Sequence, residues 1–145
     1  MVKISAYIVT LNEEKRLGKT LQALKKVADE IFVIDSGSTD KTQKIAEKYG
    51  AKFLFHKWKN ISAQKHYGQE LCQNDWVLSL DADEVLSPEL IAEIKEKMKK
   101  PTADAYRIKI CDMLPGDKKP RLFAKTYNQV RLYNRKKSNM PDDLT

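Results

Sequence analysis

Short apolar stretches alternate with stretches of helical spacing over the first 100 residues. The alternating run from Lys3 to Thr10 predicts a strand, and Asn12 predicts the cap of a helix with Glu13 and Glu14 in its first turn. The same unit recurs three times. Further strands are predicted at 30–34, 51–56 and 76–80, and further helices up to Tyr49 before Gly50, at 61–71, and from Ser87 and Pro88 to Lys100. This order is typical of an α/β fold with an open, mostly parallel sheet covered by helices.

The pattern changes after Pro101. Residues 105–110 and 129–133 predict two strands with no helix between them, which favours an antiparallel addition to the sheet. We therefore divide the chain into two parts. Residues 1–100 form a series of strand–helix units, and residues 101–145 begin a second, basic region that we expect to be incomplete.

Polar side chains follow three of the predicted strands. Thr10 ends the first strand, Asp35 ends the second, and Asp81 and Asp83 follow the fourth. In an open α/β sheet, ligands bind in the crevice beyond the carboxyl ends of the strands. The sequence therefore predicts a functional crevice at this edge.

The chain is basic, and the excess charge is uneven. It has 145 residues with 27 Lys and Arg against 20 Asp and Glu, and residues 101–145 hold ten of these cations against five acids. Such a balance indicates either an anionic partner or a solvated basic surface. No nucleic-acid-binding motif is visible, so we expect no nucleic acid partner.

The sequence also indicates the cellular compartment of the protein. No apolar run approaches the roughly 20 residues of a membrane span, and no basic leader precedes an apolar segment as in a signal peptide. Cys72 and Cys111 follow no metal or redox spacing. We expect a cytoplasmic chain with incidental thiols.

Glycine-rich phosphate loops are missing from the sequence. Neither G-x-G-x-x-G nor G-x-x-x-x-G-K-[ST] occurs, which argues against a Rossmann dehydrogenase and a P-loop enzyme. The strongest local feature is instead Asp81-Ala82-Asp83-Glu84. Two carboxylates with one residue between them at a strand end can approach one Mg²⁺ or Mn²⁺ ion. Such an ion also binds phosphate oxygens of a substrate. The alternative is a plain acidic turn before the helix at Ser87.

Three motifs in order give the chain a resemblance to a known family. Residues 8–14 are Ile-Val-Thr-Leu-Asn-Glu-Glu, residues 30–42 contain Asp-Ser-Gly-Ser-Thr-Asp, and residues 78–86 contain the D-x-D turn. The combination resembles family 2 glycosyltransferases of the GT-A fold, and looks most like the branch with lipopolysaccharide core glucosyltransferases. The resemblance implies a three-layer α/β/α domain and inverting transfer of a sugar, with UDP-hexose as the leading donor and a cell-envelope saccharide as the acceptor.

The resemblance also implies roles for individual residues. Asp35 would bind the base, Thr10 and Glu13 would line the base and ribose pocket, and Lys65 would lie near the diphosphate. Asp81 would face the ribose and the metal, and Asp83 would bind the metal, either Mn²⁺ or Mg²⁺. His66 stands where the family usually has Asn, and we interpret it as a partly exposed helix histidine.

The resemblance leaves the catalytic base unassigned. In the family an acid further along the chain deprotonates the acceptor, which places the base beyond Thr145. The basic residues from 107 to 137 would face an anionic acceptor such as lipopolysaccharide core, or the inner face of the cytoplasmic membrane. Two other functions stay open. The chain could bind a nucleoside diphosphate without transferring sugar, or Asp81 to Leu86 could be the first motif of a haloacid dehalogenase-like phosphatase.

Overall fold

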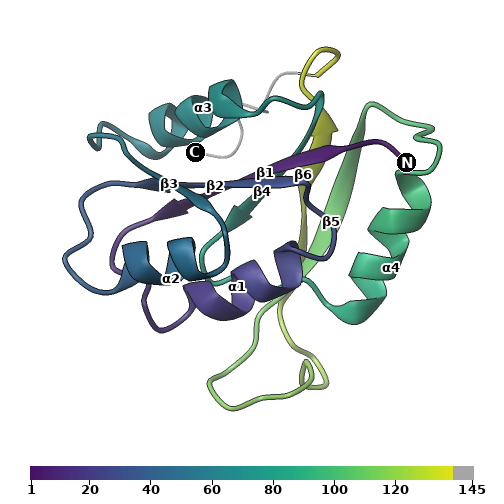
Figure 1. The fold of residues 1–145 in the computed structure, drawn as a ribbon. Helices are drawn as coiled ribbons and strands as arrows, with labels where there is room; N and C mark the ends of the chain where they lie inside the picture. Colours follow the sequence, from purple (N-terminus) through teal and green to yellow (C-terminus); the bar gives the residue numbers. More distant parts are fainter. Residues whose placement is uncertain (139–145) are drawn as a thin grey trace.

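Over the residues that the structure describes, the protein folds into a six-stranded sheet with helices on both faces (Figure 1). The computed structural model describes residues 1–138. The strand order is β3-β2-β1-β4-β6-β5. The first four strands are parallel and the last two are antiparallel to their neighbours. The strands are β1 (Ile4–Thr10), β2 (Glu30–Asp35), β3 (Lys52–Phe55), β4 (Trp76–Asp81), β5 (Ala105–Cys111) and β6 (Thr126–Asn134).

Four helices complete the three layers that the sequence predicts (Figure 1). They are α1 (Leu17–Leu24), α2 (Thr42–Lys48), α3 (Ile61–Leu71) and α4 (Pro88–Lys97). Side chains of α1, α2 and α4 pack on one face of the sheet, and side chains of α3 pack on the other. Within residues 1–138, no helix is long and apolar enough to cross a bilayer.

The two central strands are buried on both faces because helices cover both. In β1, Ala6 and Ile8 contact the layer of α1, α2 and α4, whereas Tyr7 between them packs toward α3. This division follows from the period of two along a strand. It explains why β1 and β4 are almost continuously apolar rather than alternating.

Helix α1 begins at Leu17, so the prediction of a helix capped by Asn12 is wrong. Asn12 has a φ of +52°, a left-handed conformation that asparagine tolerates better than most residues. Its backbone N–H donates to Ser38 Oγ at 2.8 Å, and its side-chain oxygen accepts from the Thr39 N–H at 2.8 Å. Asn12 therefore joins the β1–α1 turn to the β2–α2 loop instead of starting a helix.

The ends of the other helices and strands lie closer to their predicted positions. Helix α4 ends at Lys97 rather than Lys100, and β5 and β6 extend beyond the predicted strands because they pair along most of their length. Strand β6 lies between β4 and β5, so the two parts into which we divided the chain share one sheet. The division at residue 100 stays a prediction, and residues 139–145 lie outside the described residues.

Gly68 in α3 gives a direct test of the packing between this helix and the sheet. A Cβ atom at Gly68 would lie 2.7 Å from Cδ2 and 2.8 Å from Cγ of the buried Tyr7 ring. We expect Gly68→Ala to lower the free energy of unfolding by about 1–3 kcal/mol, because the helix must move away from β1. The matched control is Gly18→Ala in α1, where the nearest atom, on Tyr49, is 3.6 Å away.

Urea denaturation followed by circular dichroism measures both variants. Gly18→Ala should keep or slightly raise the stability, since alanine favours a helix over glycine by up to about 1 kcal/mol. Equal midpoints for the parent chain and Gly68→Ala would contradict the close contact of α3 with β1.

Candidate functional site

The carboxyl ends of β1 and β2 are joined by a buried carboxylate. Asp35, only 2% exposed, accepts from Thr10 Oγ1 at 2.7 Å, from the Gly37 N–H at 2.9 Å, and from the Ser38 N–H at 2.6 Å and Oγ at 2.5 Å. A φ of +120° at Gly37 lets the loop turn back onto this side chain. Four donors occupy the usual acceptor positions of a carboxylate. In this structure Asp35 therefore organises the loop, and its expected contact with a base stays a prediction.

Glu13 lies at the same edge of the sheet. Its backbone N–H donates to Thr42 Oγ1 at 2.9 Å, which ties the β1–α1 turn to the start of α2. Its carboxylate accepts from Arg16 Nε at 2.9 Å, and Arg16 Nη1 reaches Asp83 at 3.5 Å. Arg16 thus connects the turn after β1 with the turn after β4.

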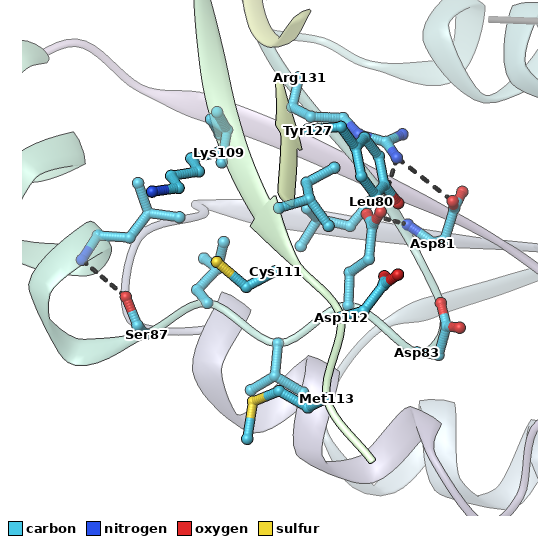
Figure 2. Close-up of a pocket in the computed structure, with 16 residues that line it drawn as sticks. Leu80, Asp81, Asp83, Ser87, Lys109, Cys111, Asp112, Met113, Tyr127 and Arg131 are labelled. Carbon is cyan, nitrogen blue, oxygen red and sulfur yellow. Dashed lines mark hydrogen bonds and ion pairs between the residues drawn. The ribbon is translucent and has the colours of Figure 1, made fainter. Parts of the chain in front are cut away.

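The end of β4 carries a second, more charged group, which we call the Asp81 cluster: Lys65, Asp81, Glu84 and Arg131. Arg131 Nη2 lies 2.7 Å from Glu84 Oε1 and 3.3 Å from Asp81 Oδ2 (Figure 2). Lys65 Nζ lies 3.7 Å from Asp81 Oδ1, and the Asp81 N–H donates to Glu84 Oε2 at 2.9 Å. Two cations, from α3 and β6, therefore meet two carboxylates, one at the end of β4 and one in the turn after it.

Burial shifts the acid–base behaviour of this cluster. Removal from water raises the pKa of Glu84, although Arg131 and a backbone hydrogen bond oppose the shift. Removal from water lowers the pKa of Lys65, although Asp81 opposes it. Arg131 is buried too, and its Nε and Nη1 atoms have no hydrogen-bond partner within residues 1–138. The cluster therefore holds its positive charge largely out of contact with solvent.

A cavity of about 530 Å³ opens beside the cluster (Figure 2). Its walls come from the turn after β4, the start of α4, and strands β5 and β6. Asp81, Asp83, Glu84 and Arg131 line it, together with Tyr127. This volume falls in the range of small-molecule sites.

The structure brings the predicted residues together as two neighbouring groups. One is the Thr10–Asp35 pair with Glu13, and the other contains Asp81 and Lys65. The groups are adjacent because β1 pairs with both β2 and β4. Of the six predicted site residues, Asp81 and Asp83 line the cavity.

Arg131 and Glu84 had no assigned role in the sequence analysis. The available signal was a single arginine inside the apolar strand Val130-Arg131-Leu132-Tyr133, since a buried cation needs an acidic partner. His66, which we interpreted as a partly exposed helix residue, is exposed and lies 3.3 Å from Glu70 on the same helix.

The carboxylates at the turn after β4 fit a hard divalent cation that also binds substrate oxygens. Within residues 1–138 no group of three or more potential ligands is close enough to form a complete protein cage. The Asp83 side chain is 55% exposed and, among residues 1–138, has one ion-pair contact, a long one from Arg16, whereas Asp81 already faces Lys65 and Arg131. Magnesium is commonly held by one or two carboxylates plus substrate phosphates and water, which matches this donor set.

Comparison with known proteins decides the family. The chain matches the model of glycosyl transferase family 2 over residues 5–144. It belongs to this family. The match gives no support to the phosphatase alternative, and it confirms the resemblance that the motifs at 8–14, 30–42 and 78–86 carry.

Two relatives extend this result. The chain is 46% identical over 137 residues to an uncharacterized glycosyltransferase of Rickettsia conorii. This match covers 92% of this chain and 49% of the relative. It is 37% identical over 105 residues to LpsC, a lipopolysaccharide core biosynthesis glycosyltransferase of Rhizobium meliloti, with 64% of this chain and 38% of LpsC covered. The chain thus spans about half the length of the first of these curated relatives.

Solved structures show the same GT-A fold. TarS of S. aureus, residues 1–349, superimposes with a TM-score of 0.57 at 24% identity, over 71% of this chain and 34% of that one. Glucosyl-3-phosphoglycerate synthase from Mycobacterium tuberculosis, in complex with Mn²⁺, UDP and phosphoglyceric acid, superimposes with a TM-score of 0.50 at 24% identity, over 58% and 34% of the two chains.

Arg131 should control both the stability of this edge and its dependence on pH. Replacing it by methionine leaves the half-buried Glu84 without its ion-pair partner, which costs about 1.5–3 kcal/mol at neutral pH. The pKa of Glu84, already raised from its ordinary 4.5 by burial, rises further. The folded state then binds more protons than the unfolded state, so we expect the stability of Arg131→Met to fall as pH increases from about 4.5 to neutral.

Urea unfolding of Arg131→Met across this pH range measures the effect. Adding Glu84→Gln to Arg131→Met should restore part of the stability and flatten the pH dependence. Arg121→Met is the control, because its exposed pair with Asp117 contributes at most about 1 kcal/mol. A loss in Arg131→Met that is no larger than the control's would contradict the role of the cluster.

Proposed function

We propose that the chain provides the donor half of an inverting, metal-dependent glycosyltransferase that uses a UDP-hexose. The observation that carries this proposal is the convergence of the Thr10–Asp35 pair and the Asp81 cluster at the carboxyl edge of one parallel sheet, beside a cavity of about 530 Å³. Membership of glycosyl transferase family 2 supports the transfer of a sugar from a nucleotide-sugar.

The nucleoside would bind over the ends of β1 and β2. Thr10, Glu13 and Asp35 are the residues to which the family resemblance gives this role. The hydrogen bonds of Asp35 and the separate bond from the Glu13 N–H to Thr42 hold the β1–α1 turn and the β2–α2 loop in fixed positions. A base that binds there meets a preorganised surface, so little loop ordering is needed on binding. The synthase of similar fold that was crystallised with UDP supports this choice of nucleotide.

The diphosphate would lie over the turn after β4. Asp83 and Asp81 would hold the Mn²⁺ or Mg²⁺ ion, and Mn²⁺ in the synthase of similar fold supports a divalent cation here. When bound, such an ion neutralises the charge of the departing diphosphate. The Lys65 ammonium and the Arg131 guanidinium supply fixed positive charge at the same edge.

The acceptor would enter from the side of β5 and β6. Similarity to LpsC supports a lipopolysaccharide core saccharide, and the ten cations of residues 101–145 favour an anionic acceptor at the inner face of the cytoplasmic membrane. We place the general base beyond Thr145, in the part of the relatives that this chain does not span. The alternative is that the chain binds the nucleotide without transferring sugar.

Calorimetric titration with UDP, with and without Mn²⁺, tests the donor site. We expect binding that depends on the metal, and we expect Asp83→Ala to weaken it by about tenfold or more because a metal ligand is lost. Asp104→Ala is the matched control, since Asp104 is an exposed acid that pairs with Lys137 away from the site.

Two results would contradict the proposal. One is a folded chain that binds no nucleoside diphosphate, and the other is an equal loss of affinity in Asp83→Ala and Asp104→Ala. Release of UDP from UDP-glucose in the presence of a core saccharide then separates a transferase from a module that only binds the donor.

A further inference from the structure

The segment between β5 and β6 exposes large apolar side chains. Residues 112–125, which we call the β5–β6 loop, extend away from the sheet at the end where α1 and α4 face each other (Figure 1). Phe123 is 95% exposed and Leu122 is 85% exposed, and Met113 and Leu114 are exposed as well. Adjacent apolar residues this exposed are uncommon on the surface of soluble proteins and mark interaction sites.

Cations flank these apolar side chains in the sequence. Lys118, Lys119 and Lys125 are exposed and have no acidic partner within residues 1–138. Arg121 differs, because its guanidinium binds Asp117 at 3.0 Å and so holds the two arms of the loop together. Three free positive charges therefore lie within a few residues of Leu122 and Phe123.

The loop has internal order that presents these groups outward. The Asp112 N–H donates to the Lys125 carbonyl at 3.0 Å and closes the base of the loop. A turn from Arg121 to Ala124, closed at 2.9 Å, carries Leu122 and Phe123 at its two central positions. Phe123 has a φ of +67°, a left-handed conformation that a bulky residue rarely adopts. The turn therefore holds both apolar side chains in solvent, where a partner could cover them.

We propose that the β5–β6 loop is a docking surface for an anionic lipid bilayer. Leu122 and Phe123 enter the boundary between headgroups and acyl chains, and Lys118, Lys119 and Lys125 contact the anionic headgroups. Apolar area and positive charge together give reversible binding at an interface. Charge complementarity favours this partner over an apolar protein surface, which three unpaired lysines would oppose.

Docking through this loop would also position the cavity. Asp112 and Met113, at the first arm of the loop, line the cavity beside the Asp81 cluster (Figure 2). A loop held at the bilayer therefore keeps the cavity mouth close to the headgroups, where a lipid-linked saccharide presents its hydroxyl groups. This consequence for the acceptor rests on the proposed function, whereas the docking itself does not.

Vesicle sedimentation of the purified 145-residue chain, without nucleotide, tests the proposal. We expect binding to phosphatidylcholine vesicles that contain about a third phosphatidylglycerol, and much weaker binding to pure phosphatidylcholine. Leu122→Ser with Phe123→Ser should weaken binding to the mixed vesicles by about tenfold. Replacing Lys118, Lys119 and Lys125 by Gln should weaken it similarly and reduce its dependence on salt.

Two matched controls come from the opposite edge of the sheet, near β3. Phe55→Ser with Trp58→Ser removes two less exposed apolar side chains, and replacing Lys41, Lys44 and Lys48 by Gln removes three exposed lysines around α2. Both controls should bind vesicles like the parent chain. Circular dichroism checks that every variant is folded.

Three outcomes would overturn the proposal: no binding of the parent chain to the mixed vesicles, equal binding by the loop variants, or an equal loss in the controls. The first is also the outcome expected if the loop binds another protein instead of lipid. UDP titration of the loop variants separates this question from the donor site. Unchanged UDP binding with lost vesicle binding would assign the two functions to different surfaces.

Discussion

The contacts of Arg131 with Asp81 and Glu84 are the interaction on which this edge of the protein depends. A buried guanidinium is expensive unless carboxylates match it, and buried carboxylates are equally expensive without a cation. Asp81 ends β4 and Glu84 lies in the turn that follows, whereas Arg131 comes from β6. The ion pairs therefore fix the strand–helix units of the first 100 residues to the antiparallel pair that follows. They also leave Asp83, two residues after Asp81, facing solvent and available for a ligand.

Local signals in the sequence account for most of the fold. Helix α3 runs from Ile61 to Leu71 as predicted, because the Asn60 side chain accepts from the Ala63 N–H and fixes the first turn. The start of α1 was predicted wrongly for a comparable reason. Asn12 has the side chain of a helix cap, but its partners, Ser38 and Thr39, come from a loop more than 25 residues away. The sequence around Asn12 alone cannot show that distant residues, rather than the next turn of a helix, bind its side chain.

In the candidate site too, the residues that local signals predict differ from those that depend on distant contacts. Thr10, Asp35 and Asp81 could be placed at one edge because parallel strands bring their carboxyl ends together. Arg131 could not be placed at this edge from the sequence. Its contact with Asp81 depends on β6 pairing with β4 rather than extending the sheet beyond β5. Periodicity predicts that a strand forms, but not which edge it joins. The four donors to Asp35 were also beyond sequence reasoning, since they depend on the path of a loop.

The position of β6 between β4 and β5 sets an order of events during folding. Strands β5 and β6 are neighbours in sequence and can form a hairpin early, with little loop-closure entropy. The pairing of Leu78 with Leu132 instead joins segments more than 50 residues apart, so it comes later. On the ribosome, the carboxylates after β4 emerge long before Arg131 does. Until the hairpin docks, the first four strands expose an unpaired edge along β4, and this exposed edge is the point where a nascent chain of this fold is most open to misassembly.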